Sequence, residues 1–386
     1  MPAKGVDTLS NSSSSYDVAV VGAGVIGLAV AWRAAQRGMR AVVLERGDPG
    51  RGASWLSAGM IAPVSEALVT EQPLLRLGLR SAELYPRFVE EVHVASGRDP
   101  GFLRCGSLLA ARDRDEAEWL ARELAIRERL GLPVNRLRAS EARRLEPALA
   151  PALRGALEIP DDHAVDPRRL TAALAEAVVV SGGEVRTGAD VTAVEIGDGC
   201  VLRDGERIAA EQVVIAAGAW SSVPGIPESA RVPVHPVKGQ ILRLRDPGGP
   251  GLLTRVLRMR TGYVVPRGDG RYVLGATMEE RGFDTTVTAG AVFELLRDAG
   301  ELLPGISELV IDELGAGLRP ATPDNAPAIG PATISGLHWA VGHYRHGILL
   351  APITAAIVVA GLCGEELPQF AEEFSPARFS EVAAWS

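Results

Sequence analysis

The sequence YDVAVVGAGVIG at residues 16–27 predicts a strand, a glycine-rich turn and the start of a helix, in that order. The β-branched and apolar side chains of residues 16–21 are typical of a buried strand in a parallel sheet. Apolar residues then recur at helical spacing from Ile26 to Met39, and Gly38 is placed as a helix stop. A second strand at residues 40–44 ends in Glu45. This strand–helix–strand pattern opens an α/β fold.

The three glycines of this stretch have the G-x-G-x-x-G spacing of a dinucleotide-binding turn. Gly22 permits the tight turn, Gly24 lets the backbone approach a pyrophosphate, and Gly27 lets helix and strand pack closely. The helix N-terminus offers free N–H groups and a partial positive charge to the phosphates. Glu45 follows Gly27 by 18 residues, where a carboxylate can accept a hydrogen bond from a ribose hydroxyl. We therefore expect a dinucleotide to bind at Gly22, Ala23, Gly24, Val25, Ile26, Gly27 and Glu45.

Two later segments favour FAD over NAD. The loop at residues 46–60 is rich in small side chains, which suits close approach of the backbone to a large planar cofactor. The apolar strand at residues 212–217 leads into Gly218 and resembles the second FAD fingerprint of flavoproteins with two dinucleotide folds. Taken alone, that segment is equally typical of any buried strand.

Composition excludes several functional classes. Among 386 residues, 40 Lys and Arg against 48 Asp and Glu give a net charge of −8, which argues against a nucleic-acid footprint. Cys105, Cys200 and Cys363 form no C-x-x-C pair, so neither a disulfide framework nor a zinc site is expected. No apolar run reaches the roughly 18 residues needed to span a membrane. Residues 1–15 have no apolar signal segment, and we interpret them as a disordered tail of a cytoplasmic protein.

Further motifs follow along the chain: SAGM at 57–60, PDDH at 160–163, PVKGQ at 236–240, GYVVPR at 262–267, LGATM at 274–278, GLRP at 317–320 and GHYRHGILLAP at 342–352. Together they resemble the glycine oxidases of thiamine biosynthesis, within the D-amino-acid oxidase superfamily of FAD enzymes. The resemblance runs from Tyr16 to about Phe374. The glycine turn is general to the superfamily, whereas GYVVPR…LGATM and GHYRHGILLAP are much more specific.

The resemblance implies an α/β fold in which a Rossmann-like FAD-binding domain is interleaved with a smaller α+β substrate domain built on an antiparallel sheet. The FAD-binding domain would take residues 16–84, 147–229 and 311–386, and the substrate domain 85–146 and 230–310. The sequence alone supports part of this division. It predicts a charged surface helix at residues 113–130 and a small antiparallel meander at 184–215.

The resemblance also implies the roles of four catalytic-site residues. Arg319 would grip the substrate carboxylate through two parallel charge-assisted hydrogen bonds. Tyr263 would pack over the substrate and offer its hydroxyl to the same carboxylate, Met278 would line the small pocket, and Arg345 would lie near substrate and flavin. Structural alternatives stay open for Tyr263 as a half-buried strand residue and for Met278 as a core residue.

The FAD contacts implied beyond the glycine turn are Glu45, Arg46, Ala53, Ser54, Ala58, Gly59, Met60, Val191, Gly218, His343, Tyr344, Arg345, His346, Gly347, Ile348 and Leu349. A helix from Ile348 to Leu362 would point its N-terminus at the flavin. His343 and His346 lack a third ligand, so no metal site is expected. Trp55 and Leu56 are bulkier than the family's small residues; they could narrow the cofactor entrance or cover the substrate.

The activity implied is oxidation of glycine: a hydride moves from the α-carbon to FAD, and oxygen is reduced to hydrogen peroxide. The imine would hydrolyse to glyoxylate and ammonia or feed thiazole formation. The resemblance also implies non-covalent FAD, because no cysteine lies in a flavin-attachment motif, and a homotetramer. Three alternatives stay open: a broader D-amino-acid or sarcosine oxidase, an amino-acid dehydrogenase with a quinone acceptor, and a nucleotide-binding sensor or scaffold. A carboxylate clamp of Arg319 and Tyr263 argues against the last.

Overall fold

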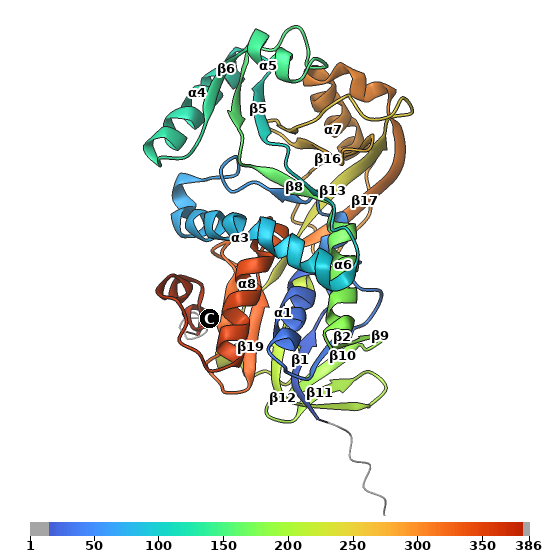
Figure 1. Ribbon diagram of the computed structural model, residues 1–386, viewed down its shortest axis with the longest axis vertical. Helices are drawn as coiled ribbons and strands as arrows, with labels where there is room; N and C mark the ends of the chain where they lie inside the picture. The colour runs from blue at the N-terminus through green and yellow to red at the C-terminus, as the bar shows by residue number, and fades with distance from the viewer. Residues whose placement is uncertain (1–14, 381–386) are drawn as a thin grey trace, which may run out of the picture.

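The computed structural model describes residues 15–380, which form two lobes with a long helix between them (Figure 1). All but the last residue of the predicted tail lies outside this range. The lower lobe in Figure 1 holds the glycine turn and the upper lobe holds a second large sheet.

The sheet of the lower lobe is built around β1, which pairs in parallel with β2 on one side and β12 on the other. Its eight strands are β1 (Tyr16–Val21), β2 (Ala41–Glu45), β9 (Glu184–Thr187), β10 (Val191–Glu195), β11 (Gly199–Leu202), β12 (Arg207–Ile215), β18 (Ala328–Pro331) and β19 (Leu337–Val341). Four helices pack in this lobe, namely α1 (Val25–Gln36), α3 (Gln72–Ser96), α6 (Pro167–Val180) and α8 (Gly347–Leu362). The parallel core explains why β1 reads as a continuous apolar run, because both of its faces are covered.

The strand predictions for this lobe are confirmed with one exception. β1 has the predicted bounds, and β10, β11 and the first half of β12 form the predicted antiparallel meander. The prediction is wrong for β9, which pairs in parallel with β2 instead. β9 follows α6, and a strand that returns after a crossover helix joins the sheet in parallel.

The sheet of the upper lobe has the order β17-β13-β16-β15-β14-β5-β7-β6, and all its pairs are antiparallel except β14 with β5. Its strands are β5 (Ser107–Ala111), β6 (Asn135–Arg138), β7 (Gly155–Ile159), β13 (His235–Arg245), β14 (Val256–Arg258), β15 (Tyr263–Pro266), β16 (Arg271–Gly275) and β17 (Val310–Ala321). The accompanying helices are α4 (Arg114–Arg129), α5 (Ala139–Leu145) and α7 (Ala289–Leu302). α4 confirms the predicted surface helix, and Asp113 caps its N-terminus by accepting from the Glu116 N–H.

Sheet membership departs from the predicted domain boundaries at two strands. β7 and β17 both belong to the upper sheet, although the boundaries place β7 and nearly all of β17 in the FAD-binding domain. α3 runs through the boundary at residues 84–85. A third, small sheet joins β3 (Met60–Ile61), β8 (His163–Val165) and β4 (Phe102–Leu103). The two-domain division as a whole stays a prediction.

α1 and α8 are buried on almost every side, which is the expected fate of a helix that is apolar all round. Trp32, Tyr85 and Phe88 pack edge to face where α1 meets α3. This core fixes the N-termini of both helices, and the residues that begin each of them line the same cavity.

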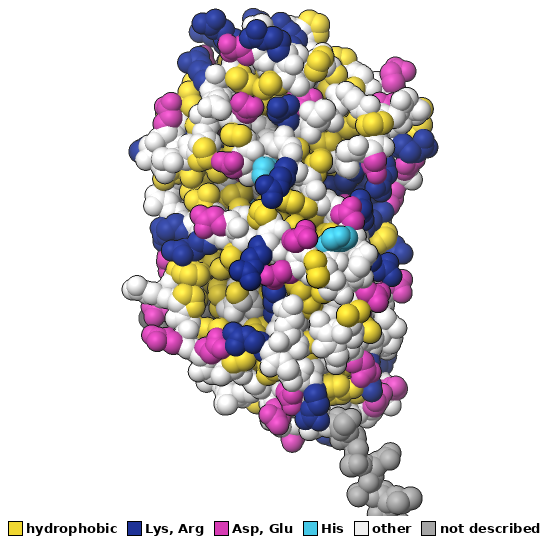
Figure 2. All heavy atoms as spheres, in the orientation of Figure 1, with side chains coloured by type: hydrophobic (Ala, Val, Ile, Leu, Met, Phe, Trp, Pro, Cys, Tyr) yellow, Lys and Arg dark blue, Asp and Glu magenta, His cyan; other side chains and the backbone are white. Residues whose placement is uncertain are grey.

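The face shown in Figure 2 carries cationic and anionic side chains intermingled with apolar ones. No helix among residues 15–380 is long and apolar enough to cross a membrane.

Candidate active site

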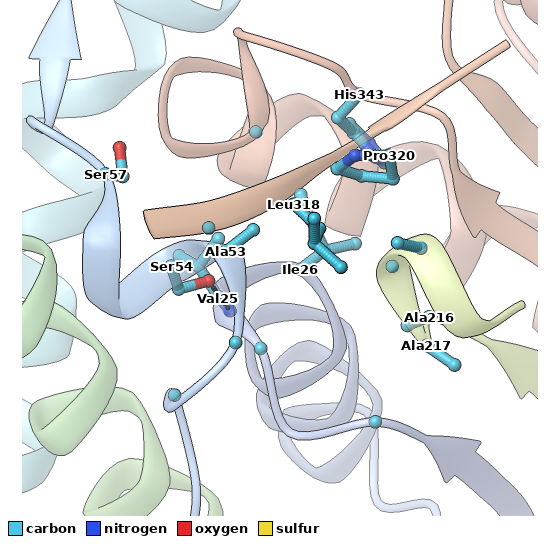
Figure 3. Close-up of a pocket in the computed structure, with 18 of the residues that line it drawn as sticks. Val25, Ile26, Ala53, Ser54, Ser57, Ala216, Ala217, Leu318, Pro320 and His343 are labelled. Carbon is cyan, nitrogen blue, oxygen red and sulfur yellow. Dashed lines mark hydrogen bonds between the residues drawn. The ribbon is translucent and has the colours of Figure 1, made fainter. Parts of the chain in front are cut away.

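One cavity of about 410 Å³ lies at the carboxyl ends of β1, β2 and β12 and extends to β15 and β17. Ligands of open α/β sheets bind at this end of the strands. Figure 3 shows that side chains from α1, the short helix α2 (Ala53–Leu56) with Ser57 after it, β17 and the segments at Ala216 and His343 surround a common space.

The glycines of the turn are required for two different reasons, which are close packing within the protein and space for a ligand. Gly22 has φ +103°, and a Cβ there would lie 2.7 Å from the Ala216 carbonyl oxygen. A Cβ on Gly27 would overlap the Gly22 carbonyl oxygen. A Cβ on Gly24 would meet only Ser54 Oγ, at 3.5 Å, although Gly24 lines the cavity. The protein itself therefore requires Gly22 and Gly27, whereas the open side of Gly24 leaves room for a ligand.

Polar groups around the turn are held in place by hydrogen bonds within the protein. Ser54 Oγ accepts from the Val25 N–H at 3.0 Å, which satisfies one free amide of α1 (Figure 3). Glu45 accepts from the N–H groups of Ala23 at 2.9 Å and Gly47 at 3.0 Å. Both Glu45 and Ser54 line the cavity, whereas Ala23 stands behind the lining.

The side chains of Trp55 and Leu56 lie in two different environments: Trp55 packs against arginines and Leu56 faces the cavity. The Trp55 ring has the guanidinium carbons of Arg51 and Arg168 each 3.7 Å from its centroid. Its carbonyl oxygen accepts from Arg243 at 2.6 Å. Leu56 instead lines the cavity and packs on the glycines of β17. Of the pair, only Leu56 narrows the site.

Arg319 reaches the cavity from β17. Its Nη1 donates to the carbonyl oxygens of Lys238 at 3.2 Å and Thr277 at 3.1 Å. The guanidinium lies directly over Gly239, where any side chain would overlap it. Among the described residues no carboxylate pairs with Arg319, so its remaining donors are available to an anionic ligand.

Tyr263 lines the same end of the cavity from β15. Burial and the nearby Glu66 carboxylate raise the pKa of its phenol, and Arg319 partly offsets this shift. The hydroxyl is therefore a donor at neutral pH. A Cβ on Gly275, its cross-strand partner, would lie 2.9 Å from the hydroxyl oxygen.

The segment before α8 closes another wall of the cavity. His343 Nε2 lies 2.9 Å from Thr354 Oγ1, and burial together with His346 lowers its pKa to about 3. Tyr344 has φ +46°, which is uncommon for a residue other than glycine. Arg345 Nε is buried and has no hydrogen-bond partner among the described residues. The Nη2 of Arg345 lies 3.7 Å from Glu71 Oε2.

Most of the predicted cofactor residues line the cavity; those that do not are Ala23, Gly27, His346 and Leu349. Tyr263, Arg319 and Arg345 line it as predicted. Met278 does not, because 65% of its surface is exposed and its Sδ accepts from the Tyr344 hydroxyl at 2.7 Å. Because Tyr344 itself lines the cavity, Met278 lies next to the lining, and its part in the substrate pocket stays a prediction.

Sequence reasoning missed Glu66, which lines the cavity near Tyr263. The only signal was a lone acid within the small and apolar stretch at residues 58–69.

The described part of the chain lacks both the side chains that could bind a metal ion and a cysteine placed to attach a flavin. No group of three His, Cys, Asp or Glu side chains could hold a metal within residues 15–380. None of the three cysteines lines the cavity. Burial raises the pKa of the Cys105 thiol to about 11 and that of Cys200 to about 12, so both are poor nucleophiles.

Comparison with known proteins agrees with this geometry. The sequence model of the family "FAD dependent oxidoreductase" (DAO) matches residues 17–360. The chain belongs to this family. A curated glycine oxidase of Geobacillus kaustophilus is 39% identical over 89% of this chain and 92% of its own length. The bifunctional protein ThiO/ThiG of Synechocystis is 34% identical over 95% of this chain, which spans about half of that protein's length.

Solved structures of family members superpose closely on this FAD-dependent oxidoreductase. The crystal structure of glycine oxidase from Geobacillus kaustophilus has a TM-score of 0.87 at 37% identity, covering 94% of this chain and 98% of that one. Iminodiacetate oxidase from Chelativorans has a TM-score of 0.83 at 31% identity, covering 93% and 98%.

The residues present fit the family's cofactor, FAD. The open side of Gly24 at the α1 N-terminus suits a pyrophosphate. Glu45 and the glycines that follow it from Gly47 onward line the same cavity. Arg345 and the first residues of α8 line the same cavity as Tyr263 and Arg319, and positive charge there would favour an electron-rich ring.

Proposed function

We propose that this protein is a glycine oxidase. The observation that carries the proposal is the meeting of Arg319 and Tyr263 at one end of a dinucleotide cavity. A cation with free donors beside a neutral phenol is a receptor for a small carboxylate, and a protein that only bound a nucleotide would need no such receptor. The glycine oxidases among the relatives support the choice of substrate.

Each residue would have a distinct part in the reaction. Arg319 would hold the carboxylate through parallel hydrogen bonds, and Tyr263 would donate a further one from its hydroxyl. Leu56 and Ile241 add apolar wall to the cavity and would keep water from the reacting carbon. Bound FAD supplies the two-electron acceptor, and the protein contributes position and electrostatics.

The wider context is part of the same proposal. Oxygen would be the final acceptor, with hydrogen peroxide as its product, and the imine would serve thiazole formation, as the ThiO/ThiG name of several relatives suggests. FAD would bind non-covalently, since no cysteine lines the cavity. A cytoplasmic location and a homotetramer follow from the family resemblance and are proposed on that basis.

A substrate panel tests the proposal. Glycine, sarcosine, D-alanine and D-proline would be compared by kcat/KM for peroxide release in air. Glycine should be oxidised at least as efficiently as the larger substrates, because Leu56 narrows the cavity. A strong preference for D-proline or D-alanine would replace glycine oxidase by a broader D-amino-acid oxidase. Reduction of an added quinone without peroxide would indicate a dehydrogenase.

A further inference from the structure

Four carboxylates line the cavity, and one of them is set apart from the others. Glu45, Asp48 and Asp190 lie around the carboxyl ends of β2 and β9, at the end where the dinucleotide turn begins. Glu66 lies on the opposite side, in the loop between β3 and α3, and approaches the upper sheet. Its side chain is 9% exposed.

Arg258 fixes the Glu66 carboxylate from one side. Its Nη1 lies 2.5 Å from Oε1, and Arg258 is the cross-strand partner of Tyr263 between β14 and β15. The other carboxylate oxygen, Oε2, lies 3.5 Å from His346 Nδ1, the limit of a hydrogen bond. One oxygen of this buried carboxylate is thus held closely by an arginine, whereas the other has only a long contact to a histidine and can accept a further hydrogen bond.

The groups around Glu66 keep it negatively charged. Burial alone would raise its pKa, but the charges of Arg258 and Arg345 contribute to lowering it below its usual value. Burial also lowers the pKa of His346 to about 4, so this histidine is neutral near pH 7. The remaining ionisable neighbours are Tyr263, whose pKa is raised, and Asp162, whose pKa is raised to about 6. Glu66 is therefore the fixed anion at the substrate end of the cavity.

An amino acid is a zwitterion and presents two opposite charges to its receptor. Arg319 and Tyr263 offer complements to the carboxylate only. A buried ammonium without an anionic or hydrogen-bonding partner would cost several kcal/mol. We propose that Glu66 is the specificity residue that recognises the substrate α-ammonium, an inference that rests on the proposed function.

This role predicts a selectivity and a pH effect. Glu66 favours amines over hydroxy acids of the same size, because a hydroxyl gains nothing from a full negative charge beyond one hydrogen bond. It also stabilises the protonated amine in the complex and so raises that amine's pKa. Since oxidation needs the neutral amine, kcat should decline at acidic pH, and the charge of Glu66 should set where that decline begins.

The test compares Glu66→Gln with two other variants. Glu66→Asp keeps the charge. Glu116→Gln is the matched control, because Glu116 is a buried carboxylate that pairs with Arg112 at 2.8 Å but lies on α4, outside the cavity. For each variant the KM for glycine is compared with the Kd for glycolate, which carries a hydroxyl in place of the amine and is followed through the flavin absorbance. FAD content and the melting temperature report on folding.

Glu66→Gln should raise the KM for glycine about 30-fold while the Kd for glycolate changes less than about 3-fold, in line with loss of one charged contact. The acidic limb of its kcat profile should move about one unit to lower pH, the size of an interaction worth about 1.4 kcal/mol. Glu66→Asp should keep most of the selectivity, and Glu116→Gln all of it.

Equal losses for glycine and glycolate, or an unmoved pH limb, would overturn the role of Glu66. If Glu66→Gln loses FAD, Glu66→Asp provides the test. A Glu66→Asp protein that retains FAD but no longer favours glycine over glycolate would contradict the inference. A wild-type protein that binds FAD but leaves glycine unoxidised would contradict the proposed function itself.

Discussion

The two ends of the cavity are built in opposite ways. The dinucleotide turn comes from 12 consecutive residues, and its chemistry is that of the backbone: glycine conformations, free amides and one helix N-terminus. The substrate end combines Tyr263 on β15, Arg319 on β17 and Glu66 in a loop nearly 200 residues earlier. Its chemistry is that of side chains. A backbone site is therefore local in sequence, whereas a side-chain site depends on how distant strands are placed.

Within the turn, the packing of α1 on β1 should decide the effect of a side chain at Gly27. Gly27→Val should prevent folding, because a Cβ there overlaps the Gly22 carbonyl oxygen where α1 packs on β1. We expect no soluble protein, or a loss of several kcal/mol in the free energy of unfolding, as for severe overpacking. Expression followed by thermal unfolding measures this. A stable Gly27→Val protein would show that close packing at this point is not required.

Gly24→Val tests whether glycine at this position is required for binding FAD and not for folding. The site of its Cβ is open, so the melting temperature of the apoprotein should change little. FAD affinity should decrease by about 100-fold or more, because the new side chain would take the place through which the backbone approaches the pyrophosphate. Fluorescence titration of the apoprotein with FAD measures this. A yellow, fully loaded variant would refute the assignment of the phosphate turn.

At the substrate end, Arg319→Ala should leave FAD affinity unchanged. It should raise the KM for glycine about 100-fold, since it removes a charge-assisted pair of hydrogen bonds. Arg319→Lys should recover only part of the loss, because an ammonium cannot make two parallel bonds. Steady-state kinetics with a parallel FAD titration distinguish the two ends. Unchanged kinetics would remove Arg319 from the site.

Tyr263→Phe should have the smallest effect. It removes one hydroxyl donor and keeps the ring, so kcat/KM should decline about 3- to 10-fold, the value of a single hydrogen bond. The pH profile should otherwise be that of the wild type, because the phenol is already protonated at neutral pH. A loss as large as that of Arg319→Ala would mean that Tyr263 does more than donate one bond.

The same contrast explains what the sequence predicted. β1, the turn, Glu45 and the helix α8 could be predicted because their patterns are local. β9 was misassigned because its sheet partner is chosen by the crossover of α6 and not by its own residues. Arg319 and Tyr263 were reached only through family motifs. Met278 lies in the right motif, but it is exposed at the surface.

Glu66 is the clearest case of a site residue that the sequence alone does not predict. Its own stretch of sequence carries one signal, a lone acid among small and apolar residues, which indicates neither its partners nor the cavity that it lines. Its burial and its charge follow from Arg258 on β14 and from the segment before α8, neither of which is near it in the chain. Only the assembled fold indicates that an anion faces the substrate end.

The central claim is that one cavity holds both FAD and a small amino acid. Its most direct test is the visible spectrum of the purified protein during addition of glycine without oxygen, followed by exposure to air. We expect a flavin band that bleaches with glycine and returns in air with release of one hydrogen peroxide per glycine oxidised. A colourless protein that FAD cannot restore, or a flavin band that glycine and the other amino acids of the panel leave unchanged, would contradict the claim.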